Sequence, residues 1–115
     1  MGGKNTKACV DMYNTLYGAY LSGKKIHFTT TGQAEHLRTD HAVGEILDFA
    51  DRIMENCMGL FGRVTEDQFK FVDFGTFATD KLYYQALRQK LADFRKIIES
   101  NTSTNGIINI VDEFA

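Results

Sequence analysis

Apolar residues recur at intervals of three and four along most of the chain, which is the pattern of amphipathic helices. One such segment runs from about residue 6 to residue 27, and a second runs from about residue 33 to residue 61. At 1.5 Å per residue the second segment would make a rod of roughly 43 Å, a length typical of helical bundles. Breaks rich in small or polar residues separate the helical segments, at 22–23, 29–32, 73–75 and 101–106.

The second half of the chain predicts two further helices. We expect the third helix to begin at Thr79 or Asp80 as its N-cap. Its apolar positions are Tyr84, Leu87, Leu91, Phe94 and Ile98. Residues 62–79 are interpreted as a connection with one short helix, whose phenylalanines lie over the end of the core. The fourth segment, residues 107–115, stops after roughly two and a half turns while it is still apolar.

These elements predict an all-α fold, an up-and-down helical bundle whose fourth helix is short or incomplete. A chain of 115 residues makes one domain, so residues 1–115 form a single bundle. We expect Ile108, Val111 and Phe114 of the fourth segment to be exposed and to need a partner surface.

Composition narrows the classes of function. Hydrophobic residues make up 43% and charged residues 24% of the chain, as in ordinary soluble proteins. The net charge of −2 argues against nucleic-acid binding by bulk positive charge. The sequence has neither an apolar run of about eighteen residues nor an apolar stretch of the signal-peptide type, so we expect no membrane contact and a cytoplasmic location. We expect Cys9 and Cys57 to be reduced core thiols in a reducing compartment.

Polar residues of the second segment form two groups on a helical wheel. His41, Glu45, Asp48 and Arg52 face away from the core and are interpreted as a solvated face with i,i+4 pairs. His36, Asp40, Asp51 and Glu55 lie instead on the shoulder of the apolar face. Acidic and imidazole groups that are half buried there are costly unless a cation neutralises them. Oxygen and imidazole ligands suit iron, manganese or zinc.

The spacing of these four groups favours a metal site between two subunits. His36 and Asp40 are one turn apart, and Asp51 and Glu55 repeat that spacing, but about 16 Å of helix separates Asp40 from Asp51. Two such helices packed antiparallel about a two-fold axis would place the first pair opposite the second. His27, at the end of the first helix, would add a further imidazole. The alternative is that these charges form salt bridges beside a helix interface and that His27 is a surface or capping residue.

The segment 25–32, followed by the His-x3-Asp-x10-Asp-x3-Glu pattern from His36 to Glu55, resembles the Dps family of mini-ferritins within the ferritin-like superfamily. In that family a histidine ends the first helix, a histidine and an acid one turn later open the second, and an Asp-x3-Glu pair follows. Residues 34–55 also resemble small Dps-like proteins encoded by bacteriophages.

The resemblance implies a ferritin-like bundle with a ferroxidase centre shared by two subunits. It assigns His27, His36 and Asp40 to one subunit's share and Asp51 and Glu55 to the share of its two-fold mate. It also implies iron as the metal, oxidation of ferrous iron by peroxide or oxygen, and a homo-oligomer, which in the family is a dodecameric shell that often binds DNA. Here the N-terminal arm carries only Lys4 and Lys7, so we expect DNA binding to be weak or absent.

Another class of function is kept beside this one. The chain would then be a non-catalytic ferritin-like structural or interaction protein, such as a phage-encoded adaptor or inhibitor. Oxidation of added ferrous iron and the mass in solution distinguish the two readings. Nucleophilic or phosphate-loop chemistry has little support, because Cys57 lies in the middle of the apolar seam and the glycine pairs lack the lysine that a phosphate loop requires.

Overall fold

All of the regular structure in residues 3–98 and 105–114, the ranges described by this computed structural model, is helical. The helices are α1 (Gly3–Thr29), α2 (Gln33–Phe61), α3 (Asp80–Ile98) and α4 (Asn105–Phe114), and a 3₁₀ turn, η1 (Glu66–Gln68), interrupts the connection between α2 and α3. The all-α helical bundle expected from the sequence is therefore confirmed. Most of the expected break at 101–106 lies outside the described residues.

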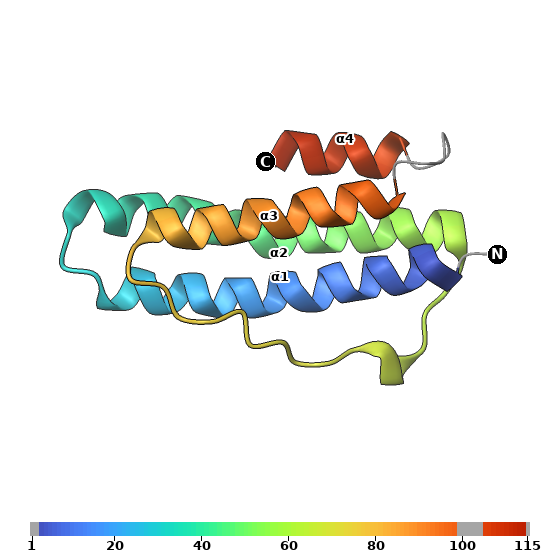
Figure 1. The fold of residues 1–115 in the computed structure, drawn as a ribbon, viewed down its shortest axis with the longest axis horizontal. Coiled ribbons are helices and arrows are strands. Elements are labelled where there is room, and N and C mark those ends of the chain that lie inside the picture. The colour runs from blue at the N-terminus through green and yellow to red at the C-terminus, as the bar shows by residue number, and fades with distance from the viewer. Residues whose placement is uncertain (1–2, 99–104, 115) are drawn as a thin grey trace.

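The helices run up, down, down and up along a molecule of 48 × 28 × 19 Å (Figure 1). A tight turn makes α1 and α2 antiparallel, whereas residues 62–79 return along the whole length of α1 before α3 begins. As a result α3 is parallel to α2. α4 then folds back antiparallel to α3, over the end of the bundle where α1 begins and α3 ends. The bundle therefore contains one long crossover, unlike bundles whose helices are joined by short turns alone.

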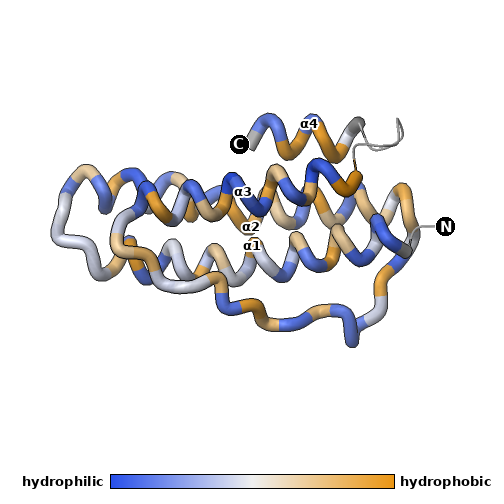
Figure 2. Tube along the Cα trace, in the orientation of Figure 1, coloured by the Kyte–Doolittle hydropathy of each residue, from blue (hydrophilic) through white to orange (hydrophobic). Residues whose placement is uncertain are grey.

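Two side chains of α1 hold the connection in place by donating hydrogen bonds to its backbone carbonyl groups. The Asn14 amide donates to the Gln68 carbonyl at 3.2 Å, and the Ser22 hydroxyl donates to the Gly75 carbonyl at 2.6 Å. Between these contacts a Cβ on Gly18 would lie 2.1 Å from the Val72 carbonyl oxygen, so only glycine permits this close approach. Hydrophobic and polar positions alternate along the connection (Figure 2). Of its phenylalanines, Phe74 and Phe77 pack against the core as expected, whereas Phe69 and Phe71 are exposed.

The core lies where α1, α2 and α3 meet. Leu16, Ile46, Ile53, Leu91 and Ile98 are among its fully buried side chains. Tyr83 is also fully buried, and its hydroxyl donates to the Ala19 carbonyl at 2.6 Å. The sequence reading placed Tyr84 rather than Tyr83 on this face; Tyr84 is half-buried.

The third helix begins as expected. The Thr79 hydroxyl accepts a hydrogen bond from the Leu82 backbone N–H at 3.2 Å, which is the contact an N-cap residue makes. Asp80 then occupies the first helical position and is only 2% exposed.

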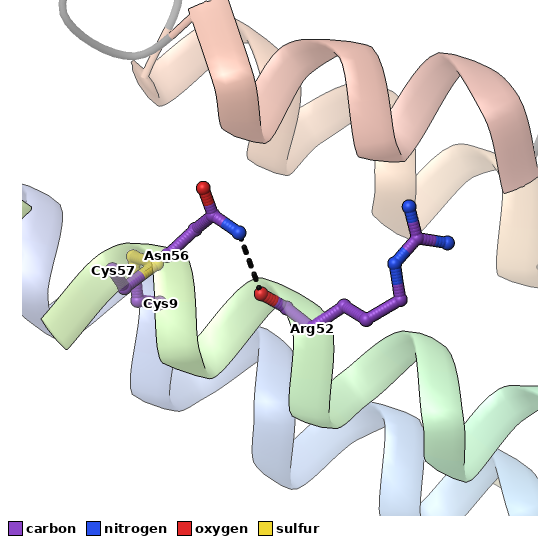
Figure 3. Close-up of a disulfide and its surroundings, with 4 residues drawn as sticks. All are labelled: Cys9, Arg52, Asn56 and Cys57. Atoms are coloured by element: carbon purple, nitrogen blue, oxygen red, sulfur yellow. Dashed lines mark hydrogen bonds between the residues drawn. A yellow bond between two sulfur atoms is a disulfide. The ribbon is translucent and has the colours of Figure 1, made fainter. Parts of the chain in front are cut away.

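The prediction that Cys9 and Cys57 are reduced thiols is wrong. The two sulfurs form a disulfide that joins α1 to α2, and the residues are 0% and 2% exposed (Figure 3). Their positions were expected to be buried, and they are. The spacing along each helix reveals burial, but it does not reveal that two buried positions 48 residues apart face each other at a Cα–Cα distance of 6.4 Å.

The expectation that the fourth segment is exposed is also wrong for the residues that can be judged. Val111 is buried, Ile108 is half-buried, and the side chain of Phe114 lies outside the described residues. Two ion pairs hold α4 on the bundle, Arg52–Glu113 at 3.0 Å and Arg95–Asp112 at 3.0 Å. The short α4 therefore covers its apolar face within the chain itself.

None of the helices in the described ranges combines the length and apolar character that crossing a bilayer requires.

Candidate metal centre

Two imidazoles meet at the turn between α1 and α2. His27 lies near the end of α1 and His36 in the first turn of α2, and their rings stack with centroids 4.1 Å apart. The turn between the two helices is only residues 30–32, so the end of one helix lies beside the start of the next. His27 is buried, whereas His36 is half-buried.

Each imidazole is oriented by the backbone of the other residue. His27 Nδ1 lies 3.2 Å from the His36 carbonyl oxygen, and His36 Nδ1 lies 3.0 Å from the His27 carbonyl oxygen. A carbonyl oxygen only accepts, so Nδ1 is the donor in both bonds. In the neutral rings Nε2 then carries the free lone pair, which is the arrangement of a metal-binding histidine whose other nitrogen donates to a carbonyl.

A carboxylate lies beside this pair. Asp40 Oδ1 is 3.7 Å from His27 Nε2, and the Asp40 side chain is 65% exposed. The residue before it, Thr39, is fully buried, and its single hydroxyl proton is shared between the Glu35 and His36 carbonyl oxygens, which lie 3.0 and 3.1 Å away. The structure thus places His27 beside both His36 and Asp40, but it does not bring all three side chains to one point.

The remaining two predicted residues lie farther along α2. Asp51 and Glu55 are one turn apart and exposed. Nineteen residues separate His36 from Glu55, or roughly 28 Å of helix, so the two ends cannot share an ion within one chain. In the described part of a single chain, no group of three or more histidine, cysteine, aspartate or glutamate side chains is placed to hold a metal.

The expected half-buried shoulder differs from the observed one. His36 is half-buried, but Asp40, Asp51 and Glu55 are exposed in the single chain. The connection between α2 and α3 lies along α1, so it adds no layer over α2 (Figure 1). The three carboxylates are therefore hydrated here, and burial alone does not require a cation beside them.

The other polar face of α2 is solvated, as expected. His41 and Glu45 form an exposed pair at 3.7 Å, and Arg52 pairs with Glu113 of α4. This face carries charge pairs without any convergence of ligand groups.

Sequence reasoning missed an ion pair next to the histidine end, between the buried Asp80 and the half-exposed side chain of Arg38. Arg38 Nε donates to Asp80 Oδ2 at 2.8 Å and Nη2 donates to Oδ1 at 3.2 Å, a bidentate pair that joins α2 to α3. The hydrogen bonds from Arg38 hold the pKa of Asp80 below its usual value. The signal available in the sequence was limited to the acid in the first turn of α3, which does not identify its partner.

Sequence reasoning also missed Tyr13. Its hydroxyl lies 3.1 Å from Asp51 Oδ1 and 3.3 Å from the Tyr17 hydroxyl. Tyr13 lies within the amphipathic segment predicted from residue 6 to residue 27, but apolar periodicity does not show where its hydroxyl is directed.

Comparison with known proteins identifies no relative: no family model, curated protein or solved structure matches the chain.

Proposed function

We propose that this chain is a Dps-like mini-ferritin subunit that binds ferrous iron between two copies of itself and oxidises it. His27, His36 and Asp40 of one subunit would form the site together with Asp51 and Glu55 of the other. The observation that carries this proposal is the histidine pair at the α1–α2 turn, in which both Nδ1 atoms donate to carbonyl oxygens.

The positions of the acids along α2 are consistent with a two-fold axis. The midpoint between His36 and Glu55 falls between residues 45 and 46, and so does the midpoint between Asp40 and Asp51. One dyad at this point would place both pairs at matching heights on two antiparallel helices. It would generate two equivalent sites, about 22 Å apart along the helix axis.

A glycine lies near the same point on the same face. On a helical wheel Gly44 falls between Asp51 and Glu55, within about 100° of His36. It is exposed, and a Cβ there would meet nothing within 4 Å. A glycine in an exposed helix interior costs about 1 kcal/mol relative to alanine. Close approach of a second helix would give that cost a structural reason.

The chemistry follows from the ligand types. Carboxylates stabilise ferric more than ferrous iron because the product carries more charge. Each ferrous ion gives one electron, so two ferrous ions reduce one hydrogen peroxide to water with uptake of two protons. An ion held by His36, Asp40 and Glu55 would keep a coordination position open for the oxidant, while Asp51 and His27 would hold a second ion or orient the first.

Metal binding by wild type and by Glu55→Gln tests the proposal. Calorimetry with zinc or anaerobic ferrous ions should show a loss of most affinity in Glu55→Gln, because the amide has no charge, while the thermal midpoint without metal should stay unchanged. Glu45→Gln is the matched control, since it makes the same change on the solvated face of the same helix and should bind like wild type. Equal affinity of Glu55→Gln and wild type would refute the proposal.

Two further measurements address catalysis and assembly. Air or peroxide oxidation of added ferrous iron should raise the near-ultraviolet absorbance faster with wild type than with Glu55→Gln. Light scattering should give a dimer or a larger oligomer, and a protein that remains monomeric with metal bound would contradict a site shared between subunits.

A non-catalytic interaction protein is the second candidate. Large apolar side chains outside the core favour it, since Phe28 is 73% and Phe71 is 77% exposed. Phe71 also lines one surface hollow with Tyr17 and Phe69, and contiguous exposed apolar side chains are typical of surfaces that bind another protein. The absence of any ferroxidase activity, together with a stable oligomer, would favour this candidate.

A further inference from the structure

Tyr13 of α1 contacts both the crossover connection, through Phe69, and a carboxylate of the candidate site, that of Asp51. Its hydroxyl donates to Asp51 Oδ1 at 3.1 Å. It has a single proton, so the Tyr17 hydroxyl, 3.3 Å away, donates the second bond of the chain. Two hydrogen bonds thus run from Tyr17 through Tyr13 on α1 to Asp51 on α2. The second carboxylate oxygen of Asp51, Oδ2, takes no part in them.

The ring of Tyr13 is held on two sides. Its centroid lies 5.0 Å from that of Tyr17 and 5.6 Å from that of Phe69, which contacts it edge-on from the connection just after η1. Edge-to-face and tilted contacts at these distances are favourable arrangements of aromatic rings. They stabilise the ring orientation in which the hydroxyl reaches Asp51.

We propose that Tyr13 is a positioning residue for the metal site, which fixes the Asp51 carboxylate so that Oδ2 is presented to an ion held by the second subunit. This inference rests on the proposed function. Hydrogen bonds from a neighbouring residue to a metal-binding carboxylate typically change metal affinity by about 10–100-fold when they are removed. The role of Tyr13 is thus to reduce the freedom of an exposed side chain that would otherwise sample several rotamers.

Titration with Co²⁺, followed by its visible absorption, tests this role without redox chemistry. Tyr13→Phe keeps the ring and its packing, so the thermal midpoint without metal should be unchanged while the dissociation constant rises about 10-fold or more. Tyr20→Phe is the matched control: it makes the same change on the same helix, at a half-buried ring that contacts Lys24, and it should bind Co²⁺ like wild type.

A double-mutant cycle distinguishes positioning from a general structural effect. If Tyr13 acts through Asp51, Tyr13→Phe should have no further effect on affinity in the Asp51→Asn background. Should Tyr13→Phe prove poorly folded, Tyr17→Phe replaces it in the cycle, with a smaller loss that should also vanish beside Asp51→Asn.

The outcomes separate the two proposals. If wild type binds no Co²⁺, both the proposed function and the positioning role are overturned. If wild type binds and Tyr13→Phe binds equally well, or loses the same affinity in both backgrounds, only the positioning role is overturned.

Discussion

Reduction of the Cys9–Cys57 disulfide should lower the free energy of unfolding by about 4 kcal/mol. The bond links residues 48 apart, so it closes a large loop in the unfolded chain. The entropy that such a loop removes from the unfolded state corresponds to about 4 kcal/mol at 25 °C. In the folded state the two sulfurs are buried side by side, and two thiols occupy nearly the same volume, so the main effect falls on the unfolded chain.

The expected change is large enough to measure in one experiment. For a domain of this size, about 4 kcal/mol corresponds to a fall of about 15 °C in the thermal midpoint. Unfolding followed by far-ultraviolet circular dichroism, with and without reductant, gives this shift, and a thiol assay on the unfolded protein confirms that the bond was intact or reduced.

The double variant Cys9→Ala/Cys57→Ala is the control, because its midpoint should not respond to reductant. The reasoning is refuted if the thiol assay shows full reduction of wild type while its midpoint stays within a few degrees of the oxidised value. It is also refuted if the purified wild-type protein shows two free thiols before any reductant is added.

Two other predictions concern charge and packing. Arg38 lowers the pKa of Asp80 in the folded protein, so the charged Asp80 carboxylate stabilises the fold. This contribution is complete above the pKa of about 4 that Asp80 has in the unfolded chain, and it is lost as the pH falls through the lower pKa of the folded state. The urea midpoint should therefore drop between about pH 5 and 3, and by less in Asp80→Asn; an equal drop in both would contradict the argument. Gly23→Ala should destabilise the bundle by about 1–3 kcal/mol, since its Cβ would lie 2.3 Å from Val43 Cγ2. Gly44→Ala has open space and should stabilise the isolated subunit by about 1 kcal/mol while weakening the proposed dimer. Chemical unfolding measures the stability of both glycine variants, and the dimer dissociation constant measures the second effect of Gly44→Ala. If both variants changed the subunit stability in the same direction, the packing argument would be contradicted.

The helices could be predicted from the sequence because each carries its own periodic signal. The second helix matches its predicted range, Gln33–Phe61, since the apolar pattern runs unbroken and glycines flank it. Gly62, with φ 93, ends it in a conformation that favours glycine. The first helix extends beyond the expected 6–27 to Gly3–Thr29, and Gly18 and Gly23 do not interrupt it. At both glycines a side chain would collide with residues from other parts of the chain, and helix propensity does not take such contacts into account.

Contacts between elements were the part that the sequence did not reveal. The disulfide, the Arg38–Asp80 pair and the Tyr13–Asp51 bond each join residues more than 35 positions apart. Periodicity shows which side of a helix is apolar, but it does not show which helix faces it or at what height. For the candidate site, the meeting of His27 with His36 followed from a short turn between two predicted helices. The match with Asp51 and Glu55 depends on a second subunit and stays a prediction.

The Cys9–Cys57 bond and the turn at residues 30–32 connect α1 and α2 near both of their ends. The two helices therefore form a closed covalent ring, to which α3 and α4 are added. Every candidate iron ligand, and the tyrosine pair beside Asp51, belongs to this ring. α4 has only ten residues and lies outside this ring, so we expect it to open locally at a lower free energy than the three longer helices. Departure of α4 would leave the spacing of these candidate ligands unchanged, so opening of the bundle on the α4 side and the geometry of the proposed metal site are physically separate.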